Sequence, residues 1–264
     1  MTAIDIFVQH ESFISVPERE SKPRITGLTC LIDTGLATGK FEDVIRSHHP
    51  FIDYVKFGWG TALVTTELER KIACLRQHDV DFFFGGTLFE KAAHQRKLDL
   101  YYNFLKRWNC RNVEISNGTL PMTNSEKARH IRDFSHDFRV FSEVGFKDSD
   151  KSETMYPAQW VEYILEDFTS GASKVITEAR EGGSSGICRS SGELRIGLIE
   201  EIVRSIPVLE DLVFEAPTKT LQSYFVKRLG ANVNLGNIAF TDVIALETLR
   251  LGIRSDTFFA MEQL

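Results

Sequence analysis

The segment Lys174-Val175-Ile176-Thr177-Glu178-Ala179-Arg180-Glu181, with the loop from Gly182 to Gly192 behind it, is the best starting point for predicting the fold. A short run with β-branched residues and period-two alternation is typical of a β-strand. Alternation predicts that Glu178 and Arg180 project from one face where the strand ends. An anionic and a cationic side chain therefore leave the strand together, beside a loop rich in glycine and serine.

The loop from Gly182 to Gly192 has the composition of an anion-binding loop, because it combines backbone N–H groups with hydroxyls and a guanidinium. We predict that Arg189 and Ser190 help to bind substrate. The alternative is a surface connection that is merely flexible. Cys188 also lies here, but no histidine base is nearby, which disfavours a reactive thiol.

The pattern of strand, loop and amphipathic helix recurs along the chain. Strands are predicted at 24–33, 53–57, 80–86, 112–116, 138–144, 174–181, 212–215 and 232–235. Helices are predicted near 41–47, 68–75, 91–107, 125–134, 160–168, 194–202, 221–229 and 243–251, with Thr66 and Glu69 at capping-box spacing before the second. This alternation predicts a single-domain (β/α)8 TIM barrel over residues 23–264, after an irregular N-terminal arm at 1–22. An open doubly wound sheet is the rival, disfavoured because no G-x-G-x-x-G follows the first strand.

Composition narrows the class of protein. The chain has 264 residues, is 42% hydrophobic and carries a formal charge of −6, with the two signs interleaved. The absence of a basic stripe argues against nucleic-acid binding. The N-terminus lacks the layout of a secretory signal, no apolar run is long enough for a membrane span, and the four cysteines are widely spaced. We therefore expect a cytoplasmic protein that binds no membrane.

In a barrel of this kind the active site lies at the C-terminal ends of the strands. Polar residues at those ends are therefore the candidates for the active site. The polar strand ends are Asp33, Lys56, Glu114 with Ser116, Glu143, Glu178 with Arg180, Glu215, Asn234 and Asn237. Several carboxylates in one barrel mouth indicate either Mg²⁺ bound by oxygen ligands or a network with lysine and arginine. Lys56 fits three roles: a Schiff-base lysine, a phosphate partner, or half of an ion pair. Lys174 begins its strand, which places it at the N-terminal end of the barrel, where residues contribute to stability and not to catalysis.

Phosphate sites in barrels often use the loops after strands seven and eight. Those loops contain Lys219 and Gly236 with Asn237, and a lysine with free backbone N–H groups suits a phosphate monoester. The alternative is that the two loops only make turns. No histidine falls at a predicted strand end, which argues against a zinc site.

Taken together, the strand ends resemble the phosphosulfolactate synthase family over residues 22 to 258. The resemblance is carried by Lys22-Pro23-Arg24, Asp53 to Thr61, Phe84 to Glu90, Val113 to Thr119, Glu143 to Lys147, Lys174 to Glu181, Phe214 to Pro217, Asn232 to Ile238, Leu246 to Arg250 and Gly252 to Thr257. It implies a (β/α)8 barrel and a Mg²⁺-dependent addition of sulfite to phosphoenolpyruvate, giving (2R)-phospho-3-sulfolactate. That product leads towards coenzyme M in methanogens and towards sulfolactate in some bacteria.

This reaction assigns roles to the charged residues. We expect Lys147, with its pKa lowered by cationic neighbours, to protonate C2, with Lys56 as second choice and Glu178 as a further catalytic residue. The remaining assignments are Mg²⁺ ligands at Glu114, Glu143 and Glu215, and substrate binding by Arg180, Lys219, Gly236, Asn237, Arg189 and Ser190. The loop from Gly182 to Gly192 is expected to close over the site.

Two other functions stay open at this point. One is a barrel lyase or aldolase that forms a Schiff base on another phosphorylated substrate through Lys56 or Lys147. The other is a non-catalytic, stress-associated homologue that keeps the barrel for binding. For the enzyme we expect small-molecule substrates and a homo-oligomer, although the sequence does not fix the number of subunits.

Overall fold

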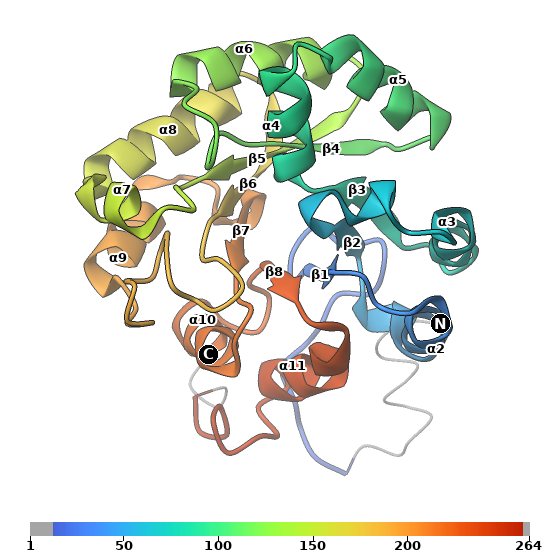
Figure 1. Cartoon of the computed structure of the whole chain (residues 1–264). Helices are drawn as coiled ribbons and strands as arrows, with labels where there is room; N and C mark the ends of the chain where they lie inside the picture. The colour runs from blue at the N-terminus through green and yellow to red at the C-terminus, as the bar shows by residue number, and fades with distance from the viewer. Residues whose placement is uncertain (1–12, 261–264) are drawn as a thin grey trace.

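The computed structural model describes residues 13–260 and confirms the predicted (β/α)8 barrel (Figure 1). Its strands are β1 (Thr29–Asp33), β2 (Tyr54–Phe57), β3 (Asp81–Phe84), β4 (Asn112–Ile115), β5 (Arg139–Val144), β6 (Ala172–Thr177), β7 (Leu212–Glu215) and β8 (Leu235–Ile238). They are parallel and hydrogen-bonded in the order β3-β2-β1-β8-β7-β6-β5-β4. The carboxyl ends of all eight strands therefore meet at one rim.

Helices surround the strands, as Figure 1 shows. They are α2 (Thr38–His48), α3 (Leu68–Gln77), α4 (Gly86–His94), α5 (Leu98–Arg107), α6 (Asn124–Ser135), α7 (Ser149–Thr154), α8 (Pro157–Thr169), α9 (Ile196–Ser205), α10 (Lys219–Leu229) and α11 (Val243–Arg250). Short 3₁₀ turns are η1 (His49–Phe51), η2 (Gly58–Leu63), η3 (Leu209–Asp211) and η4 (Phe240–Asp242). No helix among residues 13–260 is long and apolar enough to cross a membrane.

Side-chain alternation along β2 and β3 separates the barrel interior from the layer between strands and helices. Tyr54 and Phe83 both contact Phe141 of β5, with ring centroids 5.1 and 4.9 Å apart, so these rings fill the interior. Phe57 and Phe84 stack at 5.7 Å on the outer side, and Phe84 also packs on Phe104 of α5. Lys56, between Tyr54 and Phe57, consequently points inward.

The barrel has an open seam between β3 and β4, because these two strands are the ends of the hydrogen-bonded order. Side chains bridge the seam instead. The buried Asn112 of β4 donates from Nδ2 to the Phe82 carbonyl of β3 at 3.2 Å. Nearer the rim, Gly86 N, at the start of α4, donates to Glu114 Oε1 at 2.7 Å.

Ion pairs close the opposite end of the barrel. Arg19 of the N-terminal arm is buried and lies 2.9 Å from Glu247 of α11. Lys174, at the third position of β6, pairs with Asp211 at 2.8 Å, which confirms its predicted place away from the rim. Within the described part of the predicted arm, residues 13–22 contain no helix or strand; residues 1–12 lie outside the described residues.

Several predicted strand boundaries are wrong. β1 begins at Thr29 rather than residue 24, because the chain turns at Gly27, where φ is +67°. β6 ends at Thr177 rather than residue 181, and Arg180 has a φ of +54°, so strand alternation does not extend to it. β8 begins at Leu235, three residues later than predicted. Asn234 therefore lies at the entrance of β8, where its side chain accepts from Leu28 N, instead of at the rim.

The helix predictions also need two corrections. The segment predicted as one helix at 91–107 forms α4 and α5, separated at Arg96, where φ is +57°. The capping box of Thr66 and Glu69 is absent, because α3 begins at Leu68 and its first turn has no side-chain cap.

Candidate active site

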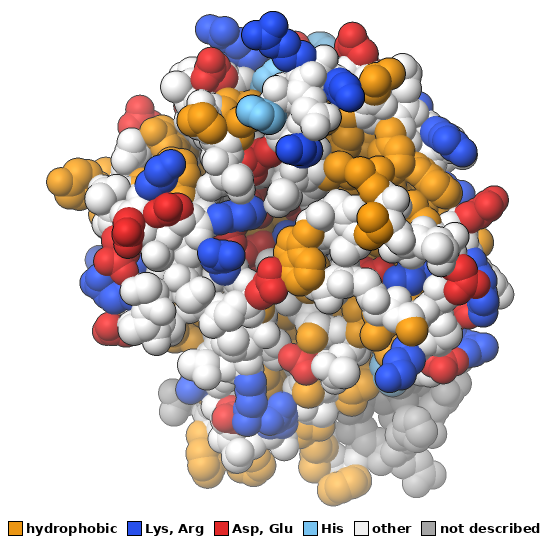
Figure 2. Space-filling view, viewed as in Figure 1, with side chains coloured by type: hydrophobic (Ala, Val, Ile, Leu, Met, Phe, Trp, Pro, Cys, Tyr) orange, Lys and Arg blue, Asp and Glu red, His pale blue; other side chains and the backbone are white. Residues whose placement is uncertain are grey.

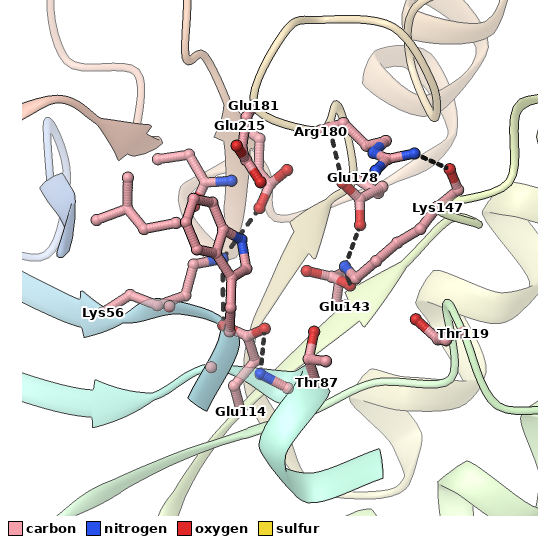
Figure 3. Close-up of a pocket in the computed structure, with 16 residues that line it drawn as sticks. Lys56, Thr87, Glu114, Thr119, Glu143, Lys147, Glu178, Arg180, Glu181 and Glu215 are labelled. Carbon is pink, nitrogen blue, oxygen red and sulfur yellow. Dashed lines mark hydrogen bonds and ion pairs between the residues drawn. The ribbon is translucent and has the colours of Figure 1, made fainter. Parts of the chain in front are cut away.

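A cavity of about 200 Å³ lies at the C-terminal rim, where the barrel prediction places the active site. Its charged lining residues are Lys56, Glu114, Glu143, Lys147, Glu178, Arg180, Glu181 and Glu215. In the view of Figure 2, acidic and basic side chains gather near the centre of the face. Figure 3 shows the cavity in close-up. Strands distant in sequence thus bring both signs of charge together.

Lys147 is held between two carboxylates, as Figure 3 shows. Its Nζ donates to Glu143 Oε1 at 2.8 Å and also to Glu178 Oε2. Glu143 is near the end of β5 and Glu178 follows β6, so two neighbouring strands present the pair. The Lys147 side chain is 27% exposed, whereas that of Glu143 is only 1% exposed. A ligand in the cavity can therefore reach the ammonium group.

Lys56 makes a second, deeper cluster. Its Nζ lies 3.0 Å from Glu215 Oε1 and 3.3 Å from Glu114 Oε2. Since these residues come from β2, β7 and β4, the lysine reaches across the barrel interior. Its side chain is only 6% exposed. Of the three roles predicted for Lys56, the structure shows the ion pair, which forms the floor of the cavity.

Both lysines are held in the protonated state. Burial by itself would lower the pKa of Lys147, but the carboxylates of Glu143 and Glu178 outweigh it and raise this pKa well above its ordinary value. In the same way, burial opposes the carboxylates of Glu114 and Glu215, which raise the pKa of Lys56. The predicted lowering of the Lys147 pKa by cationic neighbours is therefore wrong. A Schiff base, which needs a neutral amine, is disfavoured on either lysine.

The glutamates carry excess negative charge. Burial raises the pKa values of Glu114, Glu143 and Glu178, and the neighbouring lysines offset this only in part. With Glu215, four carboxylates face two ammonium groups. The cavity therefore favours a further cation, or a ligand that brings protons or cations with it.

Two glycines fix the position of Glu178. A Cβ on Gly186 would lie 1.7 Å from the Glu178 carbonyl oxygen, and one on Gly145 would lie 2.7 Å from Glu178 Cβ. Both glycines have positive φ, +66° and +126°. The backbone of the loop after β6 is thereby packed directly against this catalytic candidate, and Ile187 N donates to Glu178 O at 2.9 Å.

Two predicted substrate-binding residues, Arg180 and Asn237, line the cavity. Arg180 Nη1 donates to the Lys147 carbonyl at 3.2 Å, and the Arg180 guanidinium makes no other hydrogen bond to residues 13–260. Asn237 is only 6% exposed, yet its side-chain amide has no hydrogen-bond partner in that range. Both have left-handed backbones, with φ of +54°, a conformation that costs free energy and often marks functional sites.

The other predicted substrate-binding residues lie outside the cavity lining. Arg189 and Ser190 are exposed, and the nearest carboxylate to the Arg189 guanidinium is Glu193 at 3.7 Å. Lys219 pairs with Asp256 at 3.0 Å. Gly236 is inside β8, in register with Glu215, and so belongs to the barrel wall instead of a loop.

No residue of the loop from Gly182 to Gly192 lines the cavity in this structure, and its closure over a bound substrate stays a prediction. The first half of the loop is buried against the segment after β5: Ser185 Oγ donates to the Phe146 carbonyl at 2.7 Å, and Gly186 N donates to Ser152 Oγ of α7 at 3.0 Å. Burial also raises the pKa of the Cys188 thiol to about 11, in agreement with an unreactive cysteine.

The lining residues that sequence reasoning missed include four with polar or aromatic side chains: Trp59, Thr87, Thr119 and Glu181. Thr87 is in the first turn of α4, because that helix begins directly at Gly86. Trp59 is held at a φ of +51° inside η2. The adjacent glycines of Gly58-Trp59-Gly60 were the available signal for an unusual turn.

The carboxylates also bear on the predicted Mg²⁺ site. No three His, Cys, Asp or Glu side chains in the described ranges form a cluster suited to a metal ion. Mg²⁺, however, often takes only one or two protein carboxylates and completes its shell with water and substrate oxygens. Glu143 Oε2 accepts no hydrogen bond in this part of the chain, and Glu114 Oε2 is engaged only by the ammonium group of Lys56, at 3.3 Å, whereas both oxygens of Glu215 accept hydrogen bonds. Carboxylate oxygens suit a hard cation, so Glu143, and Glu114 in competition with Lys56, are the residues of this set that would hold one.

Solved structures of similar shape support the fold alone. The YdjI aldolase from Escherichia coli K12 has a TM-score of 0.54 at 13% identity, covering 90% of each chain. A 3-hexulose-6-phosphate synthase has a TM-score of 0.52 at 16% identity, covering 84% of this chain and 97% of the other. At such low identity these likenesses carry no functional argument.

Sequence relatives are far more similar. A phosphosulfolactate synthase of Bacillus subtilis is 53% identical over 246 residues, covering 93% of this chain and 98% of the relative. One from Methanothermobacter thermautotrophicus is 36% identical over 245 residues, covering 91% and 95%. The model of the (2R)-phospho-3-sulfolactate synthase family matches residues 17–256. The chain therefore belongs to the (2R)-phospho-3-sulfolactate synthase family.

Proposed function

We propose that the protein is a phosphosulfolactate synthase, a carbon–sulfur lyase that adds sulfite to phosphoenolpyruvate to give (2R)-phospho-3-sulfolactate. The observation that carries the proposal is Lys147, an accessible ammonium group held between two buried carboxylates at the cavity wall. Family membership supports this reaction, and the cavity contains groups suited to it.

The reaction forms one carbon–sulfur bond and moves one proton. The sulfur lone pair of sulfite attacks C3 of phosphoenolpyruvate, and the electrons of the C2–C3 double bond move to C2 and the carboxylate as an enediolate-like species. Lys147 then gives a proton from Nζ to C2. The amine regains a proton from solvent, so the net reaction consumes sulfite, phosphoenolpyruvate and one proton. A single lysine on one wall of the cavity delivers the proton to one face, which accounts for a single stereoisomer.

The remaining groups bind and orient. Arg180 offers uncommitted N–H donors to a phosphate or carboxylate, and the Asn237 amide offers another polar contact. Lys56 stays charged below the substrate and stabilises the negative charge of the enediolate. Glu114 and Glu143 would hold Mg²⁺, and the bound ion would supply Lewis-acid stabilisation of that charge.

The direct test mixes purified protein with phosphoenolpyruvate, sulfite and Mg²⁺ and follows the product by ³¹P NMR and mass spectrometry. We expect stoichiometric phosphosulfolactate, loss of turnover with a chelator, and recovery when Mg²⁺ is restored. Borohydride should trap no substrate on the protein. Unconsumed substrates would contradict the proposal and favour the non-catalytic homologue.

Replacing Arg180 by Ala should raise KM for phosphoenolpyruvate about 10- to 100-fold, the equivalent of one charge-assisted contact. Arg189→Ala is the matched control, because Arg189 lies outside the cavity lining, and its KM should stay unchanged. Steady-state kinetics at varied phosphoenolpyruvate measure both. An equal effect of the two variants would remove Arg180 from the binding site.

The pH profile tests the role of Glu178. Protonated Lys147 is the acid, so activity persists below its pKa and falls as pH rises through it. In the unchanged protein kcat should stay level as pH rises toward 10.5, because the pKa lies above that value. Glu178→Gln removes a negative charge that raises this pKa, so the alkaline fall should move to lower pH. Glu181→Gln is the control, because the Glu181 carboxylate lines the cavity without contacting Lys147. This variant should not change the pH at which kcat falls.

A further inference from the structure

Glu90 of α4 is a buried carboxylate that the proposed chemistry does not use. It is 3% exposed and forms no ion pair with any residue between 13 and 260. Its Oε1 accepts from Ser116 Oγ at 2.6 Å, and its Oε2 accepts from the backbone of Thr119 at 2.8 Å and of Leu120 at 2.5 Å. All three donors belong to the turn that follows β4. A buried carboxylate with such a set of donors fastens one segment of chain to another.

The two segments lie on opposite sides of the open β3–β4 seam. α4 follows β3, and Glu90 reaches from this helix to the turn after β4. In return, Glu114 of β4 accepts from Gly86 N, at the first residue of α4. The two carboxylates form a reciprocal clasp at the active-site end of the seam. There is no space to spare, because a Cβ on Gly86 would lie 2.3 Å from Ser116 Oγ.

The turn held by Glu90 also supports the acid. The Gly118 carbonyl accepts from Lys147 N at 3.1 Å, and a Cβ on Gly118 would lie 3.4 Å from Lys147 Cγ. Thr119, next along the turn, lines the cavity (Figure 3). Movement of this turn would therefore displace the backbone of Lys147 and the part of the cavity wall that contains Thr119 together.

We propose that Glu90 is a positioning residue, which fastens the barrel seam at its active-site end and sets the place of Lys147 through the turn from Ser116 to Leu120. The inference rests on the proposed function only for the role of Lys147. If Glu90 acts in this way, its hydrogen bonds are required but its negative charge is not. A glutamine amide can accept both backbone N–H groups on its oxygen and donate to Ser116 Oγ from its nitrogen, so the clasp needs hydrogen bonds and not a negative charge.

The test compares Glu90→Ala with Glu90→Gln, well below the melting temperature of each. Glu90→Ala should lower kcat about 10- to 100-fold with little change in KM for phosphoenolpyruvate, as expected for a support that acts through another residue. Glu90→Gln should restore kcat to near that of the unchanged protein. Equal losses in both variants would show that the charge itself acts, and an unchanged Glu90→Ala would remove the role altogether.

Asn112→Ala is the matched control, since Asn112 bridges the same seam away from the cavity. It should lower Tm and leave kcat unchanged. If it lowers kcat as much as Glu90→Ala, general loosening of the barrel explains both and the proposal fails.

Hydrogen exchange followed by NMR tests these contacts of Glu90 and requires no activity assay. It also needs only the unchanged protein and Glu90→Gln, so it remains possible if Glu90→Ala does not fold. In the unchanged protein the amides of Thr119, Leu120 and Lys147 should exchange slowly, and they should stay slow in Glu90→Gln. Exchange of these amides as fast as that of the exposed Ser191 amide would overturn the proposal, whatever the protein catalyses.

Discussion

Replacing Lys147 by Met should lower kcat about 10²- to 10⁴-fold, the range that general acids contribute. The variant removes the accessible ammonium group and leaves Glu143 and Glu178 facing each other without their shared cation. KM for phosphoenolpyruvate should change much less, because Arg180 remains. Steady-state kinetics, supported by single-turnover measurements of the chemical step, give both values.

Lys174→Met is the matched control for this experiment. Lys174 also forms an ion pair, at 2.8 Å from Asp211, but at the end of the barrel opposite the cavity. Its loss should leave kcat unchanged. If Lys147→Met retains full activity, the proton comes from another group. Lys56, the other lysine of the cavity, then becomes the first candidate.

Replacing Gly186 by Ala should destabilise the fold by about 2–5 kcal/mol, the combined cost of a left-handed alanine and of overpacking. The new methyl would lie 1.7 Å from the Glu178 carbonyl oxygen and 2.4 Å from its carbon, and these backbone atoms cannot swing aside as a side chain can. Activity should fall as well, because relief of the clash has to move Glu178. Urea unfolding measures the stability.

Gly197→Ala provides the opposite result from the same chemical change. Gly197 is an exposed residue in α9, nothing lies within 4 Å of its added Cβ, and its φ is not positive. Alanine there should stabilise the protein by up to about 1 kcal/mol. Equal unfolding midpoints for Gly186→Ala and the unchanged protein would show that the loop after β6 does not pack on Glu178 as described.

Local sequence patterns were sufficient for the barrel but not for its boundaries. β7 begins and ends where predicted, because no residue typical of turns occurs within its sequence Leu-Val-Phe-Glu. β8 was placed three residues too early, because Asn232-Val233-Asn234 alternates like a strand. In the fold, Asn234 instead bonds Leu28 and the Leu212 carbonyl at the barrel entrance. Contacts between distant segments thus overruled the local pattern.

The same limit applies to the site. Position at a strand end identified Lys56, Glu143 and Lys147 as cavity residues, since the ends of parallel strands must meet. It also suggested Lys219, whose side chain turns to Asp256 instead. Sequence position indicates that Lys219 follows a strand, but it does not reveal the ion-pair partner of Lys219, which comes from another part of the chain.

The sequence by itself determined the alternation of strands and helices, the rim on which the glutamates and lysines gather, and the family. These follow from periodicity and from motifs that are contiguous in the chain. Only the tertiary structure showed which lysine is accessible, in which direction its pKa is shifted, and that Glu90 joins the two sides of the β3–β4 seam. Burial and charge pairing depend on distances between residues far apart in sequence, and those distances exist only in the folded chain.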